Sequence, residues 1–171
     1  MKRLLIFGAG GFGKTVADVA SQLNRYDRIA FLDDGQTGEN ILGKCHEFAS
    51  FADEDTEFFA AFGNPIYRMK WLNAAVEHGC HIATLIHPRA YVSPQASVAA
   101  GSVVLPMAVV NTGVKVENGC IINCGAIVDH DCIIETGSHI APGAVVKAEN
   151  RISAGSKIDS GTVIQNREFP L

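Results

Sequence analysis

The sequence predicts two consecutive domains, an α/β domain built on a parallel sheet and then a parallel β-helix. Three observations lead to this prediction. From residue 92 onwards an aliphatic β-branched residue recurs every six positions. The first 86 residues alternate between strand-like and helix-like segments, and a glycine-rich turn joins the first two of them. We place the two domains at residues 1–86 and 87–171.

The six-residue repeat is the strongest signal in the chain. Thirteen positions in register are all Val or Ile: Val92, Val98, Val104, Val110, Val116, Ile122, Val128, Ile134, Ile140, Val146, Ile152, Ile158 and Ile164. A second column, four positions after each, holds mostly small residues such as Ala96 and Cys132. This period fits neither an α-helix nor a hairpin meander. Three hexads return the chain to its starting direction, so the repeat predicts just over four stacked coils of three short strands.

The first domain is expected to consist of four strands and two helices. Strands are predicted at residues 2–7, 28–32, 57–62 and 81–86, and helices at 14–24 and 65–78. Pro65 suits the first turn of the second helix. Strands that alternate with helices indicate a parallel, Rossmann-like sheet.

The glycine-rich turn matches the G-x-G-x-x-G pattern through Gly8, Gly10 and Gly13. An acidic pair, Asp33 and Asp34, follows the second strand. Such a turn lets the backbone approach a pyrophosphate, and the helix N-terminus favours its negative charge. Three interpretations stay open: an NAD-dependent oxidoreductase, a merely structural tight turn, and a site for another nucleotide-linked ligand. The small size of the α/β domain disfavours the oxidoreductase.

Composition excludes several other classes of function. The net charge is −4 and the 14 Lys and Arg residues are scattered, so no nucleic-acid surface is expected. No apolar stretch is long enough to span a bilayer, and we expect no targeting signal. The five cysteines form no C-x-x-C pair, which indicates free thiols and a cytoplasmic location.

Both halves together resemble the hexapeptide-repeat sugar O-/N-acyltransferases of the NeuD/PglD type, which include sialic acid O-acetyltransferases and the bacillosamine-pathway N-acetyltransferase. The resemblance covers nearly the whole chain. It is carried by residues 7–14 (FGAGGFGK), 31–34 (FLDD), 62–64 (FGN), 85–88 (LIHP), 123–132 and 137–144 (GSHIAPGA). It implies that the β-helix is left-handed, whereas generic crossover rules alone would predict the right-handed form.

The resemblance also implies the ligands. The α/β domain of this family holds a nucleotide-activated amino sugar, for which a UDP-amino sugar is expected here. Carried over by position, Gly10, Gly11 and Phe12 would lie against this substrate. Asp33, Asp34 and Gly63 would complete the substrate pocket. The family enzymes are homotrimers that bind acetyl-CoA as co-substrate between neighbouring β-helices.

His130 is the candidate catalytic base. Acyl transfer from a thioester needs a base for the acceptor's proton and a donor for the developing oxyanion. An imidazole titrates near neutral pH, and His130 belongs to a corner column that should face outward. By resemblance, Asp131 orients His130, and Asn123 contacts the acceptor or the oxyanion. Alternatively, His130 is a solvated surface histidine and Asn123 caps a corner.

His139 and Ala148 are the residues expected beside acetyl-CoA. His139 matches a family residue near the acetyl group, and Ala148 lies in the corner column of His130. His139 could instead be a subunit-interface residue. No metal site is expected, because the histidines lack the spacing of a β-helix zinc site and Cys132 falls in the inward column.

Two features depart from the family pattern. Phe12 stands where many relatives have histidine, and only about one and a half coils follow Gly143. Taken together, the repeat, the glycine turn and the resemblance make an acetyl-CoA-dependent sugar acyltransferase the leading hypothesis. The alternatives are a non-catalytic trimer that binds a sugar nucleotide and, less favoured, an oxidoreductase. The sequence does not decide the sugar, N- versus O-transfer, or the length of the acyl chain.

Overall fold

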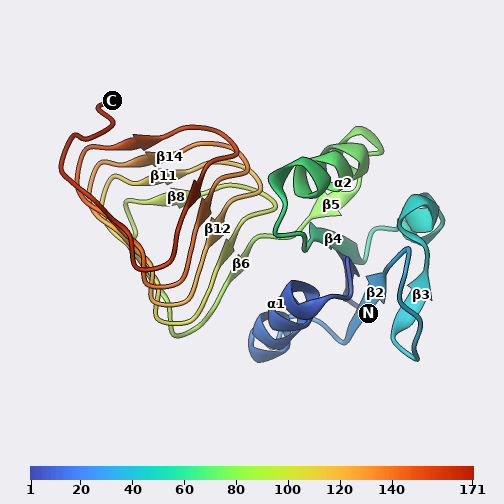
Figure 1. The fold of residues 1–171 in the computed structure, drawn as a ribbon. Helices are drawn as coiled ribbons and strands as arrows, with labels where there is room; N and C mark the ends of the chain where they lie inside the picture. The colour runs from blue at the N-terminus through green and yellow to red at the C-terminus, as the bar shows by residue number, and fades with distance from the viewer. The chain divides into compact units, whose positions relative to one another are not determined.

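The structure, a computed structural model, describes residues 1–171 as two units, Met1–Ala83 and Thr84–Leu171. The first is a Rossmann-like α/β unit and the second is a left-handed parallel β-helix (Figure 1). This confirms the predicted fold class. None of the helices has the length and apolar character that a membrane-spanning segment needs.

The α/β unit is built on five parallel strands in the order β3-β2-β1-β4-β5. The strands are β1 (Arg3–Phe7), β2 (Arg28–Leu32), β3 (Ile41–Gly43), β4 (Thr56–Ala60) and β5 (His81–Ile82). The helices are α1 (Gly11–Gln22), the 3₁₀ helix η1 (Cys45–Phe51) and α2 (Pro65–Glu77). The order reverses at β1, because β2 and β3 lie on one side of it and β4 and β5 on the other. A crevice at such a reversal is the usual ligand site in α/β sheets.

Both faces of this sheet are covered by helices, which explains its continuous apolar strands. Leu5 and Phe7 belong to the same buried cluster as Leu72 of α2. Leu4 and Ile6 point to the opposite face by the two-residue period of a strand, and they are fully buried as well. Figure 1 shows α1 and α2 on opposite sides of the sheet.

Several predicted elements of this unit need correction. The first helix begins at Gly11 rather than at residue 14, because the Lys14 N–H already donates to the Gly10 carbonyl over 3.0 Å. The strand β3 and the helix η1 were not predicted. The predicted strand 81–86 is two strands in different sheets, since β5 pairs with β4 whereas β6 (Leu85–Ile86) pairs with β9 of the β-helix.

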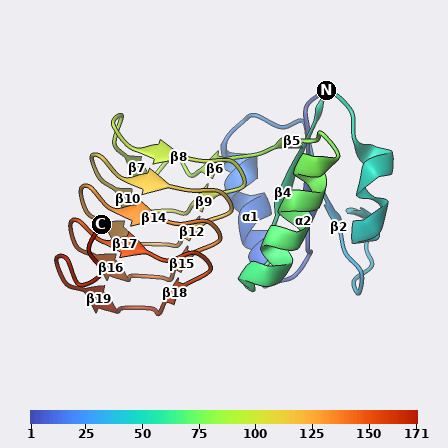
Figure 2. The same cartoon turned by 90° about the horizontal axis from the view of Figure 1, so that it is seen from above.

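The β-helix has three flat parallel sheets. Face 1 contains β7 (Tyr91–Val92), β10 (Val109–Val110), β13 (Ile127–Val128), β16 (Val145–Val146) and β19 (Val163–Ile164). Face 2 contains β8 (Ser97–Val98), β11 (Lys115–Val116), β14 (Ile133–Ile134) and β17 (Arg151–Ile152). Face 3 contains β6, β9 (Val103–Val104), β12 (Ile121–Ile122), β15 (His139–Ile140) and β18 (Lys157–Ile158). Each strand pairs with the residues 18 positions away, one coil further on (Figure 2).

The two predicted columns fill the interior of the prism. All thirteen Val and Ile residues belong to one cluster or pack against it, together with the apolar members of the small-residue column. Cys120 and Cys132 are fully buried there, and their thiols donate to backbone carbonyls of the next corner, those of Glu135 and Lys147. The period-six pattern therefore predicted the interior of this unit correctly.

The last residues lie along the edge of face 2. The Arg151 N–H donates to the Phe169 carbonyl over 2.7 Å, and Asn150 forms an antiparallel bridge with Pro170. The buried Asn150 amide accepts from the Phe169 N–H and donates to the Gln165 carbonyl. These bonds cover part of the edge strand β17, whose backbone groups would otherwise be open.

Candidate functional site

His130 and Asp131 form a pair at the corner that follows β13, between face 1 and face 2. The Nδ1 atom of His130 lies 2.8 Å from Asp131 Oδ2. The His130 side chain is 43% exposed, so its ring is within reach of a ligand. Asp129 Oδ1 accepts from the His130 backbone N–H over 2.7 Å and from Asn111 Nδ2 over 3.1 Å. Both flanking carboxylates therefore hold the histidine, one by its ring and one by its backbone.

The environment of His130 favours its protonated form. The hydrogen bond to Asp131 is the main cause that raises the pKa of His130 above 6.5. Loss of contact with water works in the opposite direction, and the negative charges of Asp129, Asp131 and Glu149 raise the pKa further. Glu149 stands one coil below Asp131 and forms an ion pair with Arg167.

Asp131 has a left-handed backbone conformation, which few residues other than glycine adopt. Its φ is +57°, in a column of left-handed corner positions that is mostly glycine. A non-glycine residue in this region costs of order 1 kcal/mol. The same conformation recurs one and two coils further on at Glu149 and Arg167, so this corner accommodates non-glycine side chains.

Asn123 and His139 form a second pair, at the corner that precedes β13. Asn123 Oδ1 accepts from the Cys124 N–H over 2.8 Å, which leaves Nδ2 as the donor of the amide. Nδ2 lies 3.0 Å from His139 Nε2, so this ring nitrogen is the acceptor. One hydrogen of the Asn123 amide is used in this bond and the second is available for a ligand.

The structure does not bring all the predicted catalytic residues together. Within one chain, the strand β13 separates the corner of Asn123 from the corner of His130, so the two pairs lie at opposite ends of face 1. Ala148 departs from the expectation that its column faces outward. It is only 3% exposed, because the next corner lies against it and its carbonyl accepts from the Arg167 N–H.

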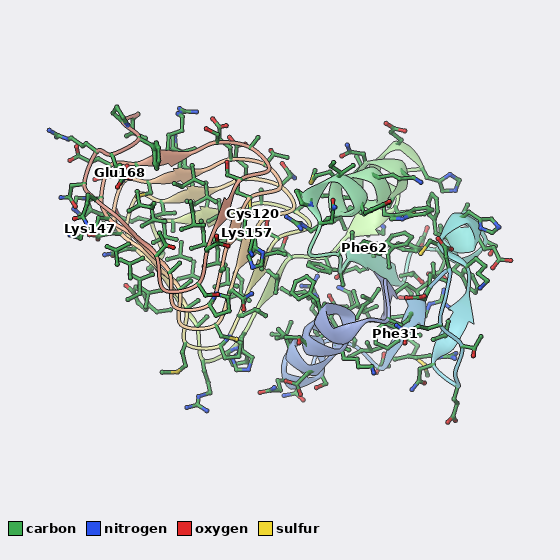
Figure 3. The ribbon with its side chains drawn as sticks, in the orientation of Figure 1. Phe31, Phe62, Cys120, Lys147, Lys157 and Glu168 are labelled. Carbon is green, nitrogen blue, oxygen red and sulfur yellow. The ribbon has the colours of Figure 1, made fainter.

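A pocket of about 360 Å³ opens in the α/β unit beside the carboxyl ends of the strands. Its walls come from the loop after β2, from η1, from the end of β4 and from α2. The lining residues are Asp33, Asp34, Gly35, Cys45, Phe62, Tyr67, Lys70 and Trp71. Figure 3 labels Phe62 in the turn between β4 and α2. The pocket therefore lies at the reversal of strand order.

Asp33 ties the pocket to the glycine turn. Its Oδ2 accepts from the Ala9 N–H over 2.7 Å, and its Oδ1 accepts from the N–H groups of Gly35 and Gln36, each over 2.8 Å. Partial burial works to raise the pKa of Asp33, but these backbone hydrogen bonds outweigh it and hold the pKa below 3.8. Asp34 Oδ1 accepts from the Cys45 N–H, so one oxygen of this carboxylate already has a partner within the fold.

The glycines of the turn divide into two kinds. Gly8 has φ +94°, and a Cβ atom on Gly13 would collide with the Gly8 carbonyl oxygen, so the fold itself requires both. A Cβ atom on Gly10, Gly11 or Gly63 would meet nothing within 4 Å. Neither packing nor a left-handed φ explains these three exposed glycines, so the space beside them is open to a ligand. Phe12 is half-buried in the first turn of α1.

Sequence reasoning missed the aromatic wall of the pocket. Tyr67, Lys70 and Trp71 line it from one side of α2, and the Lys70 ammonium lies 4.9 Å from the centroid of the Trp71 ring. Their spacing of three and four residues puts them on a common helix face. That spacing was the available signal, but core residues of a helix show the same pattern.

The side chains offer no preformed metal centre. No group of three or more His, Cys, Asp or Glu residues is arranged to hold a metal ion. All five cysteines are free thiols. Burial raises the pKa of the Cys45 thiol to about 12, so this pocket residue is uncharged at neutral pH.

Comparisons with known proteins identify relatives of the fold. Residues 3–75 match the family model described as the PglD N-terminal domain. The acetyltransferase domain of PglB from Neisseria gonorrhoeae FA1090 shares 36% identity, covers 98% of this chain over 84% of its own length, and has a TM-score of 0.95. The same domain in complex with acetyl coenzyme A gives 37% identity over 97% of this chain and 83% of that one, with a TM-score of 0.95.

More distant structures share the fold. A histidine-to-asparagine mutant of perosamine N-acetyltransferase from Caulobacter crescentus, in complex with CoA and GDP-perosamine, has a TM-score of 0.77 at 22% identity. This match covers 96% of this chain and 92% of that protein. No curated protein sequence matches the chain.

Proposed function

Because this chain belongs to the hexapeptide-repeat sugar acyltransferase family of the PglB acetyltransferase domain, we propose that it transfers an acetyl group from acetyl-CoA to a nucleotide-linked sugar. The acceptor is an amino or hydroxyl group of that sugar. The exposed His130–Asp131 pair is the observation that carries the proposal, since it supplies the base that direct transfer requires. No covalent intermediate with the enzyme is needed.

His130 acts as the general base through Nε2. The Asp131 carboxylate can only accept, so it selects the tautomer with the proton on Nδ1 and leaves the lone pair on Nε2. Nε2 takes the proton of the acceptor as it attacks the thioester carbonyl. Asp131 then stabilises the imidazolium that forms, in the manner of a carboxylate–histidine dyad.

Asn123 supplies a donor for the oxyanion. Its Oδ1 is fixed by the Cys124 N–H and its Nδ2 is fixed by His139, so the direction of the remaining N–H is set before substrate binds. A preorganised donor of this kind is worth about 3 kcal/mol of transition-state stabilisation in comparable sites. In this arrangement His139 positions Asn123 and lies close to the acetyl group.

A homotrimer would complete the site. The outer positions of face 1 form an apolar ladder of Tyr91, Val109, Ile127, Val145 and Val163. Tyr91, Ile127 and Val163 are between 41% and 55% exposed, which is unusual for a row of apolar side chains on a monomer. A threefold axis in front of this ladder would place the corner of His130 in one copy against the corner of Asn123 in the next. Acetyl-CoA would then lie between the two copies.

The pocket of the α/β unit suits the sugar nucleotide better than NAD. In dinucleotide-binding folds the acidic residue after the second strand accepts from the ribose. Here three backbone N–H groups already donate to Asp33, two to Oδ1 and one to Oδ2, so most of its acceptor capacity holds the glycine turn. The unexplained glycines Gly10, Gly11 and Gly63 give a ligand access to the backbone, and Trp71 offers an aromatic face. Phe12 adds an apolar contact beside them.

The substitution His130→Ala tests the proposal. We expect it to lower turnover roughly 10²-fold or more, with the oligomer intact, in a thiol-release assay with acetyl-CoA and a panel of UDP-amino sugars and sialic acids. His46→Ala, on the exposed side of η1, is the matched control. Near-wild-type turnover of the His130 variant would exclude this base. Failure of the wild-type protein to bind acetyl-CoA at millimolar concentration would favour the non-catalytic binding trimer.

The cellular location is a separate prediction. The five free thiols suit a reducing compartment such as the cytoplasm. Partial formation of disulfides among them in the native protein would contradict it.

A further inference from the structure

Arg68 is a fully buried arginine in α2. Its relative exposure is 0%, which makes it one of the largest side chains enclosed by the fold. A guanidinium group is costly to remove from water unless its N–H groups find acceptors. Nη1 of Arg68 donates to the Phe62 carbonyl over 2.6 Å and to the Gly63 carbonyl over 3.0 Å. Arginine is therefore kept in this interior position by a specific set of polar contacts.

The two acceptors are consecutive carbonyls of the turn between β4 and α2. No peptide bond in the chain is cis. In a trans peptide the C=O and the N–H point in opposite directions. With both carbonyls held toward Arg68, the N–H groups of Gly63 and Asn64 are directed away from it. Arg68 therefore fixes the orientation of two successive peptide groups at the edge of the pocket.

The same turn carries two walls of the pocket. Phe62 lines it from the end of β4 and Tyr67 lines it from the first turn of α2, with their ring centroids 6.4 Å apart. The Phe62 ring also lies 3.2 Å from the position of a Cβ atom on Gly8, so it borders the glycine turn. Movement of this turn would change both the pocket and its contact with the glycine turn.

Asn64 and Arg68 bind different backbone groups of the turn. Asn64 Oδ1 accepts from the N–H groups of Ile66 and Tyr67 and so caps the start of α2. The carbonyls of Phe62 and Gly63 are left to Arg68. An apolar side chain of similar length would fill the same space without a donor for either carbonyl. Lysine would bring one ammonium in place of the planar fork.

We propose that Arg68 is a positioning residue for the sugar nucleotide: it holds the Phe62–Gly63 turn in the geometry that binds the substrate, and it does not touch the substrate itself. This inference rests on the proposed function, because it takes the pocket of the α/β unit as the site of the nucleotide. Arg68 should therefore affect the affinity for the sugar nucleotide and leave the affinity for acetyl-CoA unchanged.

The chain provides its own binding probe and a matched control. Trp71 is the only tryptophan and lines the pocket, so its fluorescence reports on occupancy. Arg3 is the control, because its Nη2 donates to the Phe51 carbonyl over 2.9 Å and to Thr56 Oγ1 over 2.7 Å. These contacts lie at the amino ends of β1 and β4, the edge of the sheet opposite to the pocket.

The experiment compares Arg68→Met, Arg68→Lys and Arg3→Met by Trp71 fluorescence titration with UDP and with GDP, and by steady-state kinetics. For Arg68→Met we expect the dissociation constant of the preferred nucleotide and the KM of the sugar nucleotide to rise about tenfold, with the KM of acetyl-CoA and kcat within about twofold. Arg68→Lys should be intermediate. Arg3→Met should lose thermal stability with no change in nucleotide binding.

The outcomes separate this inference from the proposed function. A wild-type protein that binds neither UDP nor GDP refutes the nucleotide-linked substrate, and the role of Arg68 with it. A wild-type protein that binds, with Arg68→Lys and Arg68→Met binding equally well, refutes the role of Arg68 alone. If Arg68→Met does not fold, Arg68→Lys decides, and unchanged nucleotide affinity in that folded variant overturns the inference.

Discussion

The carboxylate of Asp131 occupies the space that a side chain on Gly113 would need. Gly113 stands one coil above Asp131, and a Cβ atom built on it would overlap with Asp131 Oδ1. Gly113 therefore does more than adopt its φ of +70°. It leaves room for the carboxylate that orients His130, so that a glycine 17 residues before the histidine becomes part of the site's geometry.

Substitution of Gly113 by alanine should separate this effect from backbone strain. We expect Gly113→Ala to displace Asp131 and to lower kcat at least about tenfold, because the His130 ring loses its orientation. Gly155→Ala is the matched control, since Gly155 has the same φ of +70° and open space beside it. Both variants should lose about 1 kcal/mol of stability from the left-handed φ. Equal kcat in the two variants, measured at a temperature where both are folded, would contradict the proposed role of Gly113.

The raised pKa of His130 sets the expected pH dependence. The base must be neutral, so kcat/KM should rise with pH and level off above a midpoint higher than 6.5. Asp131→Asn removes the main cause of the shift and should move this midpoint downward, together with a lower plateau. Glu149→Gln should move it less, because Glu149 makes the smallest contribution to the raised pKa. A wild-type midpoint at or below pH 6.5 would contradict a His130 whose pKa is raised by its hydrogen bond to Asp131.

The stability contribution of His130 has the opposite sign to its activity. A pKa raised in the folded state means that the fold favours the imidazolium, so this contribution is fully present below pH 6.5 and is lost as the pH rises through the raised pKa. At low pH, protonation of His130 should therefore lower the activity without destabilising the fold. Circular dichroism over the same pH range distinguishes loss of the neutral base, which leaves the spectrum unchanged, from loss of folded structure.

The β-helix was predictable from sequence because each hexad repeats one local environment. A Val or Ile that points inward has the same neighbours in every coil, so its position in the period fixes its burial. The α/β unit was less predictable at its edges. The chain from His81 to Ile86 reads as one strand, yet its hydrogen-bond partners change from β4 to β9 within those residues. Only the tertiary fold decides such a change of partner.

The candidate site was predictable to a similar degree. The sequence and the resemblance named His130, Asp131 and Asn123 as candidates, and the structure places all three at corners of the β-helix; their catalytic roles stay predictions. The pocket wall formed by Tyr67 and Trp71 was not predicted, because the face that α2 turns toward the pocket depends on how the helix packs on the sheet. The burial of Ala148 also depends on contacts with residues that follow the last coil.

The two kinds of glycine give a test of the nucleotide pocket. Gly10→Ala and Gly63→Ala should fold with thermal stability close to the wild type, because their Cβ atoms meet open space. Both should raise the KM of the sugar nucleotide about tenfold if the ligand lies against the backbone there. Gly13→Ala should instead lose about 2–3 kcal/mol or more of stability, because its Cβ atom collides with the Gly8 carbonyl. Unchanged KM in the first two variants would remove those glycines from the substrate site.

The central claim is that His130 of one copy works with Asn123 of the next, and mixed oligomers test it most directly. His130→Ala and Asn123→Ala should each be nearly inactive alone. Co-expressed in equal amounts and purified as mixed trimers, they should recover about a third of wild-type activity, because one of the three interfaces in every mixed trimer joins an intact His130 to an intact Asn123. Activity that stays at the level of the single variants in verified mixed trimers would contradict a site shared between copies.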